Sequence, residues 1–390
     1  MTELTLKGNW NYPTAVRFGP GRVSELPSAL EELSISRPLL ITDPVIAKLP
    51  ICKTVQAVLK KAKIKAGLFK DVKPNPVGDN VSDGVKAFKK GKHDGVIAFG
   101  GGSALDAAKA VAMMIGQKRS LWDYEDVGDW WTRIKPAGMV PVVAIPTTSG
   151  TGSEVGRSSV IVDLSTHTKK IIFHPKMLPA KVICDPELTF DMPARLTGAV
   201  GIDALSHNLE AYCVNGFHPQ ADGIAVEGMR LVNLGLVKAY KNGRDVAARS
   251  QMMAASAMGA TAFQKGLGAM HSVAHAIGGM FDTHHGTTIA VMMPYVLHFN
   301  RQAVAERLGR ASAYIGLGRS SFEGFVDWVM MLRREVGIPH TLAELGVKPE
   351  AAPALAERAA VDPTAGSNPV ALNPTNLRQL IERALSGRMT

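Results

Sequence analysis

The sequence is poor in cysteine, poor in aromatic residues and free of long uninterrupted apolar runs. Its three cysteines, Cys52, Cys184 and Cys213, are isolated and show no CxxC spacing, so a reduced setting accounts for them. Charge or glycine interrupts every apolar stretch well short of the length that a bilayer span needs. The first residues, MTELTLKGNWNYPT, have no basic region followed by an apolar run. We therefore expect a cytoplasmic protein without a secretory signal.

Nucleic acid is disfavoured as a partner although the formal net charge is +10. Basic residues are scattered, no arginine run is interleaved with aromatic residues, and aromatic content is only 6%. A basic surface that favours anionic cofactors or substrates is the preferred interpretation. The 390 residues exceed what one compact core usually holds, so two domains are expected.

The two halves of the chain differ in pattern. The first half alternates β-branched runs with helical spacing, which predicts an α/β domain with a mainly parallel sheet. The expected strands are 15–18, 39–42, 96–99, 140–145, 159–162 and 182–184, and the expected helices are 45–62 and 80–90. The strand at 159–162 is also compatible with an antiparallel hairpin. From residue 194 onward only helical patterns occur, as in 221–240 and 246–261. We therefore predict an α/β domain over 1–190 and an all-helical domain over 191–390.

Histidines and an aspartate in the second half have the spacing of a metal site. Asp203 and His207 are four residues apart, as are His271 and His275, and His285 follows in THHG. Residues four apart share one face of a helix, so each pair can converge on one point. Imidazoles with one carboxylate suit Fe²⁺ or Zn²⁺ better than Ca²⁺ or Mg²⁺. The spacing leaves two choices open, between His271 and His275 and between His284 and His285.

A glycine turn in the first half is typical of phosphate binding. VIAFGGGSALDAAK (96–109) reads as a strand, a glycine turn and a helix start, which together offer free N–H groups to an anion. Ser103 can cap that helix and donate to a phosphate. IPTTSGTGSEV (145–155) is a second candidate, although alone it is typical of a solvated loop. Asp43 follows an early strand, where it either accepts from ribose hydroxyls or caps a turn.

The chain resembles the iron-containing alcohol dehydrogenases in the order of four motifs. These are GGGSALDAAK, PTTSGTGSEV, GIDALSHNLEAY and GLGAMHSVAHAIGG with the later HHG. The resemblance implies an N-terminal dinucleotide-binding domain, a helical metal-binding domain and a homodimer or larger homo-oligomer. It implies NAD rather than NADP, because Asp43 matches the acidic position, and Fe²⁺ with Zn²⁺ as the alternative. The implied metal ligands are Asp203, His207, His271 and His285, with His275 as a non-ligand histidine that relays protons. The implied cofactor residues are Asp43, Asn75, Gly101, Gly102, Ser103, Asp106, Thr147, Thr148, Thr151 and Lys170.

The implied reaction is hydride transfer between an alcohol or hydroxy acid and NAD, with reduction of an aldehyde or ketone in reverse. Two departures from the family pattern stand out. His284 replaces the proline that commonly precedes the last ligand, and FQKGLG introduces Lys265, which favours an anionic substrate group. The alternatives are a dehydroquinate synthase-like lyase and a hydroxyacid–oxoacid transhydrogenase.

Overall fold

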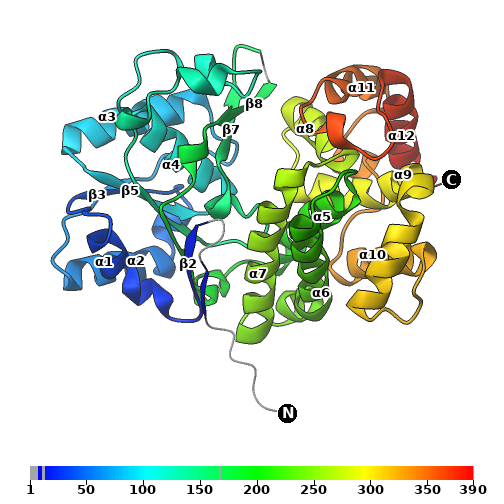
Figure 1. Ribbon diagram of the computed structural model, residues 1–390, viewed down its shortest axis with the longest axis horizontal. Coiled ribbons are helices and arrows are strands. Elements are labelled where there is room, and N and C mark those ends of the chain that lie inside the picture. Colours follow the sequence, from blue (N-terminus) through cyan, green and yellow to red (C-terminus); the bar gives the residue numbers. More distant parts are fainter. Residues whose placement is uncertain (1–7, 11–13, 167, 390) are drawn as a thin grey trace. The chain divides into compact units, whose positions relative to one another are not determined.

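The computed structural model describes residues 8–10, 14–166 and 168–389. The chain divides into two compact units. One contains the described residues up to Thr148 together with Gly152–Phe190, and the other contains Ser149–Thr151 and the chain from Asp191 onward. The predicted fold class, an α/β part followed by an all-helical part, is confirmed (Figure 1).

A seven-stranded sheet forms the centre of the first unit, with the strand order β1-β2-β9-β6-β5-β3-β4. Only β1 runs antiparallel to its neighbour, and the other pairs are parallel. Every residue of β3, β5 and β6 is buried, as expected for parallel strands covered on both faces. The strand bounds are β1 Gly8–Trp10, β2 Ala15–Phe18, β3 Pro38–Ile41, β4 Gly67–Phe69, β5 Gly95–Gly100, β6 Val142–Pro146 and β9 Lys181–Cys184.

Helices and one hairpin complete this unit. The helices are α1 Leu26–Glu31, α2 Pro50–Lys61, α3 Gly78–Gly91 and α4 Gly102–Met114, and the hairpin joins β7 Ser158–Asp163 to β8 Thr168–Phe173. The helix expected over 45–62 is interrupted, because Leu49 is extended before Pro50, and α2 begins only at that proline. The hairpin alternative for 159–162 is confirmed, with β8 as its second strand, whereas β1 and β4 were not expected from the sequence.

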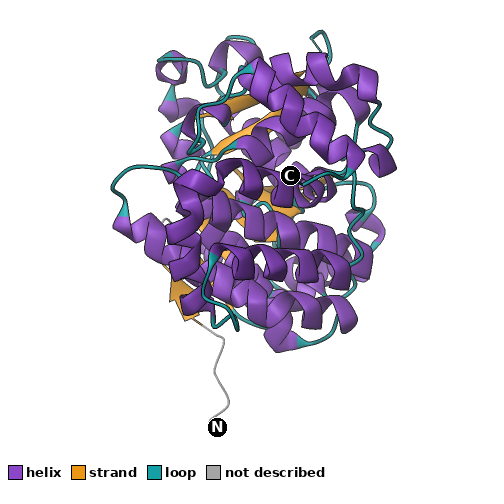
Figure 2. Cartoon of the chain, turned by 90° about the vertical axis from the view of Figure 1, so that its right-hand side faces the viewer, coloured by secondary structure: helices purple, strands orange, loops and turns teal. Residues whose placement is uncertain are grey.

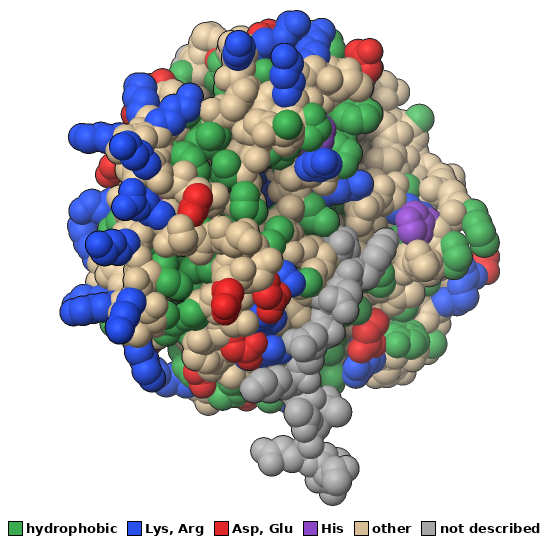
Figure 3. Space-filling view, turned by 60° about the vertical axis from the view of Figure 1, so that its left-hand side comes forward, with side chains coloured by type: hydrophobic (Ala, Val, Ile, Leu, Met, Phe, Trp, Pro, Cys, Tyr) green, Lys and Arg blue, Asp and Glu red, His purple; other side chains and the backbone are tan. Residues whose placement is uncertain are grey.

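Exposed lysines gather near the carboxyl ends of two helices of this unit. Figure 3 shows many Lys and Arg side chains on the surface of the molecule. Lys60 and Lys61 lie in the last turn of α2, and Lys89 and Lys90 in the last turn of α3. Cations there oppose the negative end of the helix dipole, so part of the net positive charge stabilises local structure.

The second unit is made of helices packed side by side (Figure 2). No described residue after Cys184 belongs to a strand. Helix α5 is buried from Thr197 along almost its whole length and contacts α6, α7 and α9. The helix bounds are α5 Ala194–Cys213, α6 Pro219–Lys241, α7 Val246–Ala262, α8 Ala269–Phe281, α9 His285–Ile315, α10 Phe322–Glu335, α11 Ala352–Ala360 and α12 Pro374–Ser386. Within the described ranges, none of the chain's helices has the length and hydrophobicity to cross a membrane.

Candidate metal centre and nucleotide-binding turn

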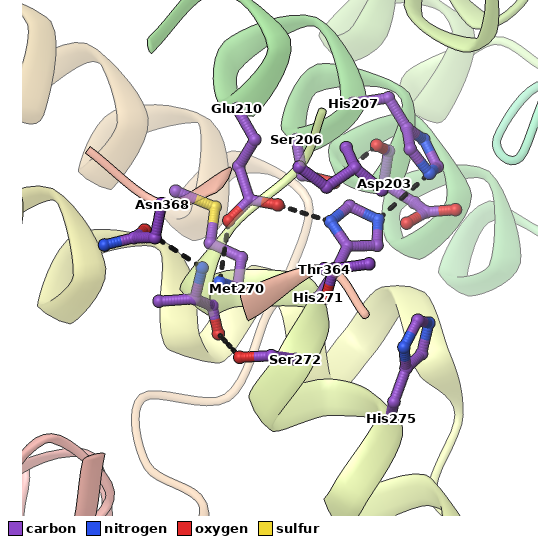
Figure 4. Close-up of polar contacts among 12 residues, drawn as sticks. Asp203, Ser206, His207, Glu210, Met270, His271, Ser272, His275, Thr364 and Asn368 are labelled. Atoms are coloured by element: carbon purple, nitrogen blue, oxygen red, sulfur yellow. Dashed lines mark hydrogen bonds and ion pairs between the residues drawn. The ribbon is translucent and has the colours of Figure 1, made fainter. Parts of the chain in front are cut away.

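Three helices bring together the side chains that the sequence predicts as metal ligands. Asp203 and His207 lie one turn apart on α5, and His271 lies in the first turn of α8. One ligand atom of each lies within 4.8 Å of the other two, and all three residues are buried. Figure 4 shows the three side chains turned toward one another.

His285, the first residue of α9, reaches the same place from a third helix. Its Nε2 lies 3.7 Å from Asp203 Oδ1, and its ring centroid lies 5.5 Å from that of His271. A close approach of α9 to α5 makes this possible. A β-carbon at Gly286 would lie 2.6 Å from the carbonyl oxygen of Ala199, so only glycine fits there.

The two buried imidazoles turn their Nε2 atoms toward each other. The Nε2 atoms of His207 and His271 lie 3.0 Å apart. Burial lowers the pKa of both histidines to about 4, so each ring is neutral near pH 7 and carries a single N–H. His271 Nδ1 lies 2.5 Å from Glu210 Oε2. When Glu210 is a carboxylate, the imidazole N–H donates in this contact and Nε2 keeps its lone pair.

These donors fit a divalent transition metal. Two nitrogen ligands each about 2.1 Å from one ion lie roughly 3–3.4 Å apart as the angle between them goes from 90° to tetrahedral, and the Nε2 separation of 3.0 Å falls at the lower end of that range. Asp203 Oδ1 is buried and receives no hydrogen bond from the described residues, as expected of an oxygen that faces a cation. The residues that could hold the ion are therefore Asp203, His207, His271 and His285.

Glu210, which the sequence analysis did not single out, holds His271. Besides the imidazole it accepts the backbone N–H of Met270 at 2.7 Å, and its carboxyl group is 5% exposed. Burial raises the pKa of Glu210 to about 7, against the opposing effect of N–H groups at Met270 and Gly268. A cation at the site would favour the carboxylate form.

His275 lies one turn beyond His271 on α8 and is held by a different acid. Its Nδ1 is 3.0 Å from Asp362 Oδ2, and its ring stacks on His285 with centroids 5.4 Å apart. Burial alone would raise the pKa of Asp362, but His275 and the hydrogen bonds from Thr364 lower it. An Nδ1–H donated to Asp362 leaves His275 Nε2 able to accept a proton.

His284 and Lys265, the two departures from the family pattern, are both engaged within the protein. His284 is the N-cap of α9, and its Nδ1 accepts the backbone N–H of Thr287 at 3.3 Å. The Lys265 ammonium is 3% exposed and lies 2.7 Å from Asp222 Oδ1, and Asp222 also pairs with Arg307. Lys265 therefore shares one counter-ion with Arg307, and its role toward an anionic substrate group stays a prediction.

In the first unit, the predicted glycine turn joins β5 to α4. Gly100 has φ 145°, a left-handed conformation that glycine tolerates, and Gly101 is the N-cap of α4 without a capping side chain. Ser103 does not cap the helix as expected, because it lies inside the first turn and its hydroxyl donates to the carbonyl of Pro74. That bond ties Ser103 to the 74–77 segment, which also contains Asn75.

Two other predicted residues, Thr147 and Thr148, lie beside this turn. Thr147 donates its backbone N–H to the carbonyl of Gly100 at 2.9 Å, and a β-carbon at Gly101 would lie 3.3 Å from Thr148 Oγ1. The hydroxyls of Thr42 and Thr147 are buried and find no hydrogen-bond partner among the described residues. Unpaired hydroxyls and free helix N–H groups at the ends of parallel strands fit an anionic cofactor. Thr151 belongs with the second unit.

The charged members of the predicted cofactor set have partners inside the first unit. Asp43 caps the turn after β3, since its Oδ1 accepts from Val45 and Ile46 N–H at 2.8 and 2.9 Å. Asp106 accepts from the Ser153 hydroxyl and the Val160 N–H. Lys170 lies 3.2 Å from Glu125 and 3.3 Å from Asp163, and these acids raise its pKa although burial lowers it. Their roles toward a cofactor stay predictions.

Comparisons with known proteins agree with this arrangement. Residues 13–186 match the family model described as iron-containing alcohol dehydrogenase, and residues 197–385 match that of the family's C-terminal part. The NAD-dependent methanol dehydrogenase of Bacillus methanolicus is 36% identical over 97% of this chain and 100% of its own.

Two solved structures are also similar. A 1,3-propanediol oxidoreductase has a TM-score of 0.91 at 32% identity, over 97% of this chain and 99% of its own. The sulfoacetaldehyde reductase of Bifidobacterium kashiwanohense, in complex with NAD⁺, has a TM-score of 0.87 at 26% identity, over 96% and 97%. With both family models matched over most of its length, the chain belongs to the iron-containing alcohol dehydrogenase family.

Proposed function

We propose that this alcohol dehydrogenase uses Fe²⁺ and NAD to interconvert a small alcohol and its aldehyde or ketone. The observation that carries the proposal is the buried pair of Nε2 atoms, 3.0 Å apart, beside the Asp203 carboxylate. In this proposal Asp203, His207, His271 and His285 hold the metal within the domain formed by 191–390, and the domain formed by 1–190 binds NAD. A bound ion would supply Lewis acidity toward the substrate oxygen, and NAD would exchange the hydride.

The protein's own residues would then orient the substrate and move its proton. His207 and His271, kept neutral by burial, supply lone pairs without first losing a proton. His275 is the proposed proton acceptor, through Nε2, because Asp362 fixes its Nδ1. The α4 N-terminus, with Gly101, Gly102 and Ser103, would bind the pyrophosphate, flanked by Asn75, Asp106, Thr147, Thr148, Thr151 and Lys170.

Asp43 supports NAD over NADP in this proposal. Its Oδ1 caps a turn, but a β-carbon at Gly100 would lie 3.7 Å from Oδ2, so the carboxylate is beside the glycine turn. A carboxylate there would accept from ribose hydroxyls and repel a 2′-phosphate. We also propose that the protein is cytoplasmic and that it forms a homodimer or larger homo-oligomer. Sedimentation analysis would test the oligomeric state.

The test is an NAD(H)-linked assay on metal-free protein loaded with Fe²⁺ under anaerobic conditions, with Zn²⁺ in parallel. Neutral alcohols, diols and hydroxy acids are compared, each with NAD and with NADP, and the hydroxy acids are also tested together with an oxo acid as hydride acceptor. We expect net NADH formation that depends on metal. The absence of NADH in all arms, with conversion of an oxo acid at the expense of a hydroxy acid, would instead support a transhydrogenase. Turnover of a single substrate without net NADH and without an oxo acid would support a dehydroquinate synthase-like lyase.

A further inference from the structure

The N-terminus of α8 is capped by side chains from other parts of the helical unit. Gly268, the N-cap, has no side chain to offer. The N–H of Ala269 is instead accepted by Asn368 Oδ1 at 3.1 Å, and that of Met270 by Glu210 Oε1 at 2.7 Å. The first free N–H groups of the helix thus depend on two residues, one on α5 and one in the loop before α12.

Glu210 uses its two oxygens for two different donors. Oε1 faces the backbone of Met270, and Oε2 faces His271 Nδ1, as the dashed lines of Figure 4 show. Oε1 accepts, because a backbone N–H can only donate, and in the carboxylate form Oε2 can only accept as well. Acceptance by Oε2 forces the His271 proton onto Nδ1 and leaves the lone pair on Nε2, the atom that faces His207.

We infer that Glu210 is a positioning residue, which fixes the tautomer of His271 so that its Nε2 can bind the metal. The inference rests on the proposed metal site. A carboxylate that accepts from the second nitrogen of a ligand histidine typically changes metal affinity by about 10–100-fold when it is removed. Asn368 performs the capping part of the same task without contacting the imidazole.

Glu210→Gln separates the two parts, because glutamine has one acceptor and one donor in nearly the same shape. If its oxygen keeps the Met270 bond, its NH₂ faces His271 Nδ1, which must then accept, and the proton moves to Nε2. If the amide is flipped, two donors meet at Met270. The flipped arrangement leaves two buried donors facing each other and is disfavoured, so the first arrangement dominates and weakens the metal site, while the side chain still fills its buried position.

The experiment measures Kd for Fe²⁺ anaerobically and for Co²⁺ by its visible spectrum, on the full chain. The variants are Glu210→Gln, Asn368→Ala, and Glu357→Gln as a matched control on the exposed face of α11. We expect Glu210→Gln to weaken binding about 10–100-fold, with the circular dichroism and the NADH affinity unchanged. Asn368→Ala should lower Tm and keep the wild-type Kd, and Glu357→Gln should change neither.

A wild-type Kd in Glu210→Gln would overturn the inference. So would an Asn368→Ala protein that loses metal affinity in step with its stability, because capping alone would then explain the effect. The latter test holds even if Glu210→Gln does not fold. Failure of the wild-type chain to bind either metal would instead refute the proposed metal site itself.

Discussion

Replacing Lys109 by methionine should both destabilise the first unit and weaken its nucleotide binding. Lys109 lies on α4 in GGGSALDAAK, and its side chain is 1% exposed. Its ammonium donates to the carbonyls of Ser153 at 3.0 Å and Gly156 at 3.5 Å, and also to that of Ser158. It lies 3.4 Å from Asp106 Oδ1. Burial lowers the pKa of Lys109, and Asp106 and Glu154 oppose that shift.

The magnitude follows from what methionine leaves behind. Removing one partner of a buried ion pair costs about 3–5 kcal/mol, and each carbonyl that loses its donor adds to the cost. Methionine requires no desolvation and has a similar length, so we expect the low end, about 3 kcal/mol. For a unit of this size that corresponds to a fall in Tm of roughly 6–12 °C.

The functional effect follows from the position of the anchored segment. Lys109 holds the segment that follows Thr147 and Thr148, which lie beside the glycine turn. If that segment loosens, NADH binding should weaken about tenfold, equivalent to about 1.4 kcal/mol. Metal content should not change, because the proposed ligands all belong to the other unit.

The assays are urea unfolding, fluorescence titration with NADH and metal analysis, each compared with the wild type. Lys89→Met on α3 is the matched control, because Lys89 is exposed and the substitution is the same. A Lys109→Met protein with wild-type stability and wild-type NADH affinity would refute the anchoring role. A protein that lost metal as well would show that the effect is not confined to the nucleotide side.

Three further predictions concern the helical unit. His271→Ala should abolish metal retention and turnover together, and metal analysis that finds the wild-type content would contradict its assignment as a ligand. Gly228→Ala should cost about 2–5 kcal/mol in urea unfolding, because its β-carbon would lie 2.0 Å from Oδ1 of Asn208, whose amide donates to Ala204 and Ala255. Gly223→Ala, with no atom within 4 Å of the added carbon, is its control. Lys265→Ala should lower stability but leave the ratio of kcat/KM for anionic and neutral aldehydes unchanged, since the Lys265 side chain is only 3% exposed and is held by Asp222. A changed ratio would support a substrate role for Lys265.

Spacing within one helix was readable from the sequence, and contacts between distant segments were not. Asp203 and His207 share a helical face whatever surrounds them, and the structure places them together with His271. The choice between His284 and His285 depended on where α9 begins, which puts one residue at the cap and the other inside the first turn. Asp362, 87 residues from His275, lies in a loop that local patterns do not place.

The role of Glu210 could not be predicted from the sequence either, although this residue lies within the quoted motif GIDALSHNLEAY. A glutamate on a helix is ordinarily solvated, and its burial became visible only once α8 was seen to begin against α5. Its spacing is nevertheless informative. Asp203, His207 and Glu210 follow each other at intervals of four and three, so they occupy one face of α5. Two of them can reach an ion directly, and the third reaches the histidine that α8 contributes. One face of α5 therefore carries two metal ligands, Asp203 and His207, and also the residue that sets the tautomer of His271, 61 residues beyond Glu210. For this reason Asp-x3-His-x2-Glu is a more specific signature of this site than Asp-x3-His alone.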